Sequence, residues 1–166
     1  YLIYVHHGVR NLEQDSRVLD YILGQADRSQ FVKQVILMEF GDVHYRTQKH
    51  SKLIKMVIPY DGQFHYTLMR NKFIEYFQPA HNALLLYSEP DTHITDFGYK
   101  KSVEMMDEFD VVHFPLMRMD EVGSNNLLEG RSSTNEVSGA FDSYGTARMT
   151  LLSKASVLYE TRGWDE

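Results

Sequence analysis

Two carboxylates and an imidazole follow directly after an apolar segment in the middle of the chain. Residues 83–88 read Ala-Leu-Leu-Leu-Tyr-Ser, and Glu89, Asp91 and His93 come next. In an extended backbone, side chains two positions apart point the same way, and Pro90 favours that geometry at Glu89. Carboxylate oxygens with one imidazole suit manganese or magnesium, and such an ion also binds the oxygens of a substrate diphosphate. The spacing therefore indicates a candidate metal site.

The same residues also fit a purely structural turn. Acidic residues are common where a strand ends. Asp91 would then be the N-cap of a following helix, and His93 would be a solvated side chain. The spacing alone leaves both interpretations open, so the surrounding elements matter.

Short apolar segments bounded by Gly, Pro and Asp alternate along the chain with segments of helical periodicity. We expect strands at 2–7, 34–40, 53–60, 83–88 and 111–117, helices at 12–25, 64–77 and 99–109, and a strand followed by a helix ending at Gly163 within 147–166. Residues 120–146 are rich in Ser, Gly and Asn, which predicts a long loop or lid.

This alternation predicts the α/β class. We expect a three-layer sandwich, with a mostly parallel central sheet and helices on both of its faces. Ligands of such sheets bind beyond the carboxyl ends of the strands, which is where Glu89, Asp91 and His93 are expected.

Composition narrows the function classes. The 166 residues suit a single domain, 1–166, and the net charge of −6 argues against binding of a nucleic acid polymer. The absence of cysteine excludes disulfides and thiolate metal sites and leaves the compartment open, although a cytoplasmic-type soluble domain is the expectation. No apolar run approaches the ~20 residues that a membrane span needs.

Four further segments are informative because of their order along the chain relative to the acidic cluster: 2-LIYVHHGVRN-11, 36-ILMEFGD-42, 70-RN-71 and 163-GWDE-166. Together with Glu89-x-Asp91 they resemble the family 2-like glycosyltransferases with a nucleotide-sugar-binding type A fold. Glu89 stands where that family usually has a first Asp, and Asp91-x-His93 offers an alternative register. Phe40 stands where a second acidic residue is common. The catalytic base of inverting members lies beyond the Gly-Trp-Asp-Glu segment, so we expect a chain truncated at its C-terminus.

The resemblance implies roles for particular residues. The donor would be a nucleotide diphosphate sugar, most often a uridine one (a UDP-sugar), and the acceptor a saccharide or other hydroxyl compound. Mn²⁺ or Mg²⁺ would bind at Glu89, Asp91 and His93. Glu39 would accept hydrogen bonds from the base or ribose, and Arg70 would bind a phosphate oxygen. The full set of expected nucleotide-binding residues is His6, Gly8, Arg10, Glu39, Arg70 and Asn71. On the acceptor side, Trp164 would bind the acceptor, and Asp165 and Glu166 are the catalytic candidates.

Three other interpretations remain open. The domain could be a glycosyltransferase-like binding module without catalytic activity. The elements His65-Tyr66-Thr67 and His93-Ile94-Thr95 could belong to a two-histidine phosphoesterase, with the imidazoles as acid and base. A metal nuclease would combine Asp91 with Glu104 and with Lys100 or Lys101.

Overall fold

A computed structural model describes residues 1–5, 12–40, 44–59, 66–89, 94–114 and 150–163. The predicted apolar segments form six strands: β1 (Leu2–Val5), β2 (Val35–Phe40), β3 (Leu53–Ile58), β4 (Leu84–Ser88), β5 (Val111–His113) and β6 (Leu151–Lys154). The amphipathic segments form the helices α1 (Leu12–Arg28), α2 (Tyr66–Phe77), α3 (Asp96–Met105) and α5 (Ala155–Glu160). All of the expected strands and helices that fall on described residues are therefore present.

The strands form a single mixed sheet in the order β3-β2-β1-β4-β6-β5. Strand β1 pairs in parallel with β2 and β4, and β2 pairs in parallel with β3. Strand β6 runs antiparallel to both of its neighbours, β4 and β5. The predicted α/β class is confirmed, and its parallel part is joined to an antiparallel part through β6.

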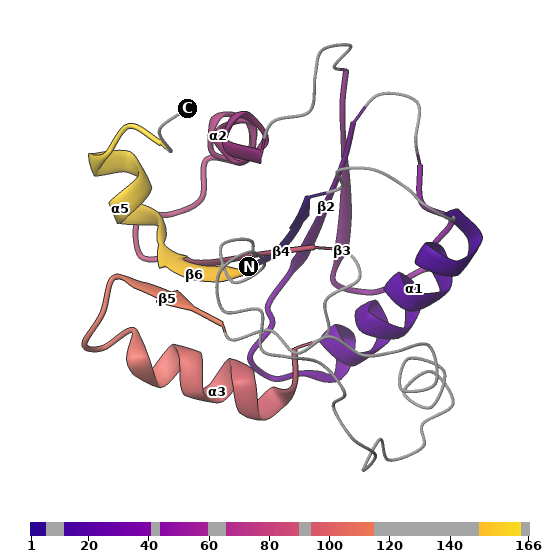
Figure 1. The fold of residues 1–166 in the computed structure, drawn as a ribbon, viewed down its shortest axis with the longest axis horizontal. Helices are drawn as coiled ribbons and strands as arrows, with labels where there is room; N and C mark the ends of the chain where they lie inside the picture. The colour runs from indigo at the N-terminus through magenta and orange to yellow at the C-terminus, as the bar shows by residue number, and fades with distance from the viewer. Residues whose placement is uncertain (6–11, 41–43, 60–65, 90–93, 115–149, 164–166) are drawn as a thin grey trace, which may run out of the picture.

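Apolar side chains cover both faces of this sheet. On one face, Val35 and Leu37 of β2 pack in a cluster with Leu23 of α1 and Tyr99 of α3. On the other face, Ile36 and Met38 pack in a second cluster with Phe73 of α2 and Leu158 of α5. Strand β2 is buried along its whole length, as a strand covered on both faces must be. Figure 1 shows α1 and α3 on one side of the sheet and α2 and α5 on the other.

Helix α3 begins three residues before its predicted start. Thr95 has an extended backbone, and its hydroxyl oxygen accepts a hydrogen bond from the N–H of Gly98 at 3.1 Å. Thr95 is therefore the N-cap of α3. The alternative interpretation of Asp91 as the cap of this helix is wrong.

Candidate functional site

The carboxyl ends of four parallel strands define one edge of the sheet. Strand β1 lies between β2 and β4, with Val5 opposite Met38 and Tyr4 opposite Ser88. Glu39 near the end of β2 and Glu89 just beyond β4 therefore lie at this same edge, on either side of β1. The structure thus brings these two predicted site residues to the place where an open α/β sheet binds its ligands.

Glu39 is a buried carboxylate with several partners. Its Oε1 accepts a hydrogen bond from the backbone N–H of Tyr45 at 2.7 Å, and its Oε2 lies 3.2 Å from Nδ1 of His44. The ammonium group of Lys55, on β3, lies 3.8 Å from Oε1. The Glu39 side chain is only 2% exposed, whereas the His44 side chain is 52% exposed. Glu39 is therefore an internal charge that fixes the connection between β2 and β3.

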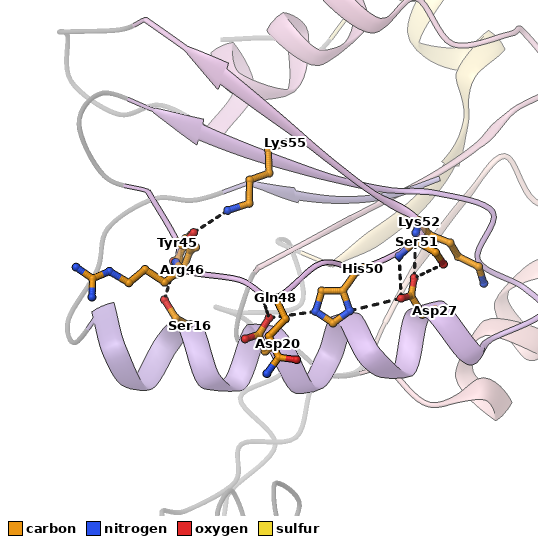
Figure 2. A network of polar contacts seen from close by, with 10 residues as sticks. All are labelled: Ser16, Asp20, Asp27, Tyr45, Arg46, Gln48, His50, Ser51, Lys52 and Lys55. Carbon is orange, nitrogen blue, oxygen red and sulfur yellow. Dashed lines mark hydrogen bonds and ion pairs between the residues drawn. The ribbon is translucent and has the colours of Figure 1, made fainter.

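Residues 45–52 of that connection lie along α1 as a strap (Figure 2). The N–H of Arg46 donates to Ser16 Oγ at 3.2 Å, and the N–H of Gln48 donates to Asp20 Oδ1 at 2.8 Å. Because Ser16 and Asp20 are four residues apart, they lie on one face of the helix. These bonds tie the strap to α1 on the His44 side.

Asp27 holds the other end of the strap. Its carboxylate accepts hydrogen bonds from the N–H of Ser51, the hydroxyl of Ser51 and the N–H of Lys52, at 3.0, 3.1 and 3.0 Å. Partial burial acts to raise the pKa of Asp27, but the hydrogen bonds from Lys52 and Ser51 outweigh it and hold the pKa below its ordinary value. His50 lies between two acids, with Nε2 3.1 Å from Asp20 Oδ1 and Nδ1 3.5 Å from Asp27 Oδ2. The strap is therefore attached along its whole length.

The end of β4 carries a buried hydroxyl pair. Ser88 Oγ lies 3.3 Å from Thr150 Oγ1, and both residues are buried. This contact joins the end of β4 to the residue before β6. Glu89 follows immediately and is half-buried. The candidate metal ligand is thus placed on a fixed part of the backbone.

Arg70 lies close to this end of β4. Its guanidinium carbon is 5.3 Å from the centroid of the Tyr87 ring, a cation–π contact, and the residue is buried. The Phe73 ring, one turn along α2, packs edge-on against the same Tyr87 ring with centroids 6.1 Å apart. Helix α2 therefore holds a permanently charged side chain next to the strand that leads to Glu89.

Asn71 meets the chain segment that follows α5. Helix α5 ends in a Schellman motif, in which the N–H of Gly163 donates to the carbonyl of Leu158 at 2.7 Å and the N–H of Arg162 donates to Tyr159 at 3.3 Å. Gly163 has a φ of +101°, and a β-carbon there would lie 2.6 Å from Oδ1 of Asn71. The two segments 70-RN-71 and 163-GWDE-166, far apart in sequence, are thus in contact at Asn71 and Gly163.

Several predicted site residues lie outside the described part of the chain: His6, Gly8, Arg10, Asp91, His93, Trp164, Asp165 and Glu166. Within the described ranges, no three His, Cys, Asp or Glu side chains are grouped as a metal site requires. None of the helices in these ranges is long and apolar enough to cross a membrane.

The structure also bears on the rival interpretations. Thr67 lies within α2 and Thr95 caps α3, so neither His-x-Thr element contributes its threonine from a strand, as two-histidine chemistry usually requires. Lys100 and Lys101 form exposed ion pairs with Glu104 on α3, at 3.9 and 2.8 Å. Such pairs on a solvated helix face are ordinary surface contacts.

Sequence reasoning missed His44, Lys55, Ser88 and Thr150 as members of this edge. His44 stands in a polar, basic stretch with no motif of its own, Lys55 is the one charged residue of the apolar strand β3, and Thr150 reaches Ser88 only through the fold. The one usable signal was the strand end itself, since polar side chains near the carboxyl end of a buried strand lie at the ligand edge.

Comparison with known proteins places the fold. No protein-family model and no curated protein matches this chain. Among solved structures, the chain is similar to the crystal structure of 4-diphosphocytidyl-2C-methyl-D-erythritol synthase from Anaerococcus prevotii, with a TM-score of 0.50 and 9% sequence identity, covering 97% of this chain and 74% of that one. At this identity the likeness shows a shared fold.

Proposed function

We propose that this chain is a glycosyltransferase of the type A fold, a three-layer sandwich with a Rossmann-like nucleotide-binding half, similar to the family 2-like enzymes. It would move a sugar from a nucleotide diphosphate sugar, most often a UDP-sugar, to a hydroxyl group. The observation that carries the proposal is the contact between Asn71 and Gly163, because it joins two of the segments on which the resemblance rests.

Charged residues at both ends of this edge support a site for a nucleotide diphosphate. Glu39 and His44 lie at the β2 end of the edge, where the nucleoside would bind. Arg70 lies at the β4 end, where a guanidinium would bind phosphate oxygens. The donor would therefore lie across the end of β1, with its base toward β3 and its diphosphate toward β4.

Glu89, Asp91 and His93 would hold Mn²⁺ or Mg²⁺ next to Arg70. Their oxygen-rich donor set suits either ion, and Glu89 follows directly after the buried end of β4. When bound, the ion would supply Lewis-acid stabilisation of the leaving diphosphate. The Arg70 guanidinium would also help to neutralise the negative charge of the leaving diphosphate.

The acceptor would bind next to Gly163. Trp164, Asp165 and Glu166 follow Gly163 directly in the sequence. Asp165 or Glu166 would take the proton of the acceptor hydroxyl as it attacks the anomeric carbon, in place of the base that inverting family members have beyond this segment. The Schellman motif supports this role by fixing the backbone immediately before these residues.

A second candidate is transfer of the nucleotidyl group itself. The similar solved structure is named as a synthase of a diphosphocytidyl compound, and the fold is shared with it. Both chemistries would use the same nucleotide edge, but their products differ. Glycosyl transfer releases a nucleoside diphosphate, whereas nucleotidyl transfer from a nucleoside triphosphate releases inorganic diphosphate.

Thermal unfolding with a nucleotide panel, with and without manganese, tests the binding step. Uridine diphosphate at 100 times its dissociation constant should stabilise the protein by about 2.7 kcal/mol. The shift should need manganese and should vanish in Glu89→Ala and Asp91→Ala. The matched control is Glu104→Ala, which removes an exposed carboxylate from α3 and should keep the shift.

Product analysis then separates the two chemistries. Release of uridine diphosphate from a UDP-sugar would support glycosyl transfer, and release of inorganic diphosphate from a nucleoside triphosphate would support the second candidate. No shift with any nucleotide would contradict both.

A further inference from the structure

The carboxylate at the end of β2 is closed to ligands, and the imidazole beside it is open. Both Glu39 oxygens have partners within the protein, namely the N–H of Tyr45, Lys55 and the ring of His44. With 2% of its side chain exposed, Glu39 has no free surface to offer a nucleoside. Half of the His44 side chain is exposed at the same end of the sheet. A ligand at this edge would therefore meet His44 before Glu39.

In the arrangement that we infer, Glu39 selects which nitrogen of His44 carries the proton. An ionised carboxylate only accepts hydrogen bonds, so the contact between Glu39 Oε2 and Nδ1 requires a hydrogen on Nδ1. In the neutral imidazole, Nε2 is then left with its lone pair and acts as an acceptor. The same arrangement of a carboxylate behind a histidine fixes ring orientation and tautomer in many binding sites.

The surroundings hold this pair rigidly. The N–H of Tyr45 is bound by Glu39, and the Tyr45 carbonyl accepts from the Lys55 ammonium group at 2.7 Å. Tyr45 itself is buried in the apolar cluster on the α1 side. The residue after His44 is thus fixed at both backbone polar groups and at its side chain. Among the described residues, the charged groups facing the imidazole are Glu39 from β2 and, behind it, Lys55 from β3.

We propose that His44 is the residue that recognises the nucleoside, with Nε2 accepting a hydrogen bond from a ribose hydroxyl or a base N–H. Glu39 is a positioning residue that acts through His44. This inference rests on the proposed nucleotide site and replaces the expected direct contact of Glu39 with the base or ribose.

The first test uses His44→Asn. The asparagine amide occupies the place of Nδ1, so this variant keeps a donor for Glu39 and loses Nε2. Calorimetric titration with uridine diphosphate and manganese should show about tenfold weaker binding than for the unaltered chain, with little change in melting temperature, as expected for the loss of one hydrogen bond. Equal affinity in both proteins would overturn the role of His44 and leave the nucleotide site standing. No binding by the unaltered chain would overturn both.

Ligand analogues identify the donor. The effect of His44→Asn should disappear with 3-methyluridine diphosphate if the base N–H is the donor, or with the 2′,3′-dideoxy analogue if a ribose hydroxyl is. An effect that persists with both analogues would assign His44 to the phosphates and overturn the nucleoside contact.

The second test uses Glu39→Gln and measures the tautomer of His44, which would not change if Glu39 only stabilised the fold. Nitrogen-15 spectra of the imidazoles should show His44 protonated on Nδ1 when neutral, and glutamine should shift its neutral form toward the Nε2–H tautomer. An Nε2–H tautomer in the unaltered chain would overturn the proposal.

Discussion

At the scale of single residues, position 163 favours glycine for two reasons, one in the local backbone and one in a contact with a distant residue. Its φ of +101° lies in the region that favours glycine, and a β-carbon would lie 2.6 Å from Asn71 Oδ1. Arg162, in the preceding position, has a φ of 60°, so two successive residues at the end of α5 have left-handed backbone. The fold itself therefore explains why glycine stands at position 163 of the Gly-Trp-Asp-Glu segment, whether or not a ligand binds there.

Replacement of Gly163 by alanine should separate these two causes. We expect Gly163→Ala to lower the free energy of unfolding by about 2–4 kcal/mol, from backbone strain and from the clash with Asn71. In the Asn71→Ala background the same substitution should cost about 1–2 kcal/mol, because only the strain remains. Urea unfolding of the four proteins measures the difference. An equal cost in both backgrounds would show that Asn71 does not limit the space at Gly163.

For Glu39, the sequence predicted the position of the residue in the sheet but not its contacts. Its position near the end of a buried strand predicted that it lies at the ligand edge, and the structure places it at that edge, while its predicted contact with the base or ribose stays a prediction. Its partners were not predictable, because His44 and Lys55 come to it through the connection between two parallel strands and obey no fixed spacing. The buried hydroxyl pair of Ser88 and Thr150 was missed for the same reason.

At the scale of elements, the strap at 45–52 shows how the described part of the connection between β2 and β3 is held without helical structure. Parallel strands need a long crossover, and a backbone without regular structure must find other hydrogen-bond partners. Side chains of α1 supply them at Ser16, Asp20 and Asp27 (Figure 2). Helix α1 thus packs its apolar face on the sheet and uses its polar face to hold the connection that contains His44.

The stability supplied by Asp27 should depend on pH. Its pKa is lowered in the folded protein, so the stabilisation is fully present above the unfolded-state pKa of about 3.9 and is lost as the pH falls through the lower, folded-state value. Asp27→Asn keeps one acceptor oxygen for three donors and should cost about 1–3 kcal/mol near pH 7.

The pH dependence is checked by denaturant unfolding of both proteins at pH 7 and at pH 3. The gap in unfolding free energy between the unaltered chain and Asp27→Asn should narrow at pH 3. Glu13→Gln, an exposed change on α1, should show no such gap at either pH. A gap that stays constant would mean that Asp27 acts through shape rather than through its charge.

At the scale of the whole molecule, apolar alternation was enough to predict the parallel half of the sheet. Buried runs such as those of β2 and β4 stand between helical segments, and each helix covers one face. The antiparallel direction of β6 was not predictable, because a four-residue strand reads the same in both directions and its partners, β4 and β5, are distant in sequence. The start of α3 was predictable in principle from Thr95-Asp96, since a capping residue followed by an acid marks a helix start.

The two apolar clusters should unfold together, and Phe73 offers the sharpest test. Phe73 is 0% exposed and stacks on Phe77 while touching Tyr87, the ring that holds Arg70. Phe73→Ala should lower the free energy of unfolding by about 3–5 kcal/mol, whereas Phe97→Ala, at a side chain that is 70% exposed, should change it by less than about 0.5 kcal/mol. Fluorescence and circular dichroism should give coincident transitions in both variants, since both faces share one sheet. Separate transitions in Phe73→Ala would mean that the α2 and α5 side melts alone, and the face of the sheet that carries Arg70 would then be less stable than the face that α1 covers.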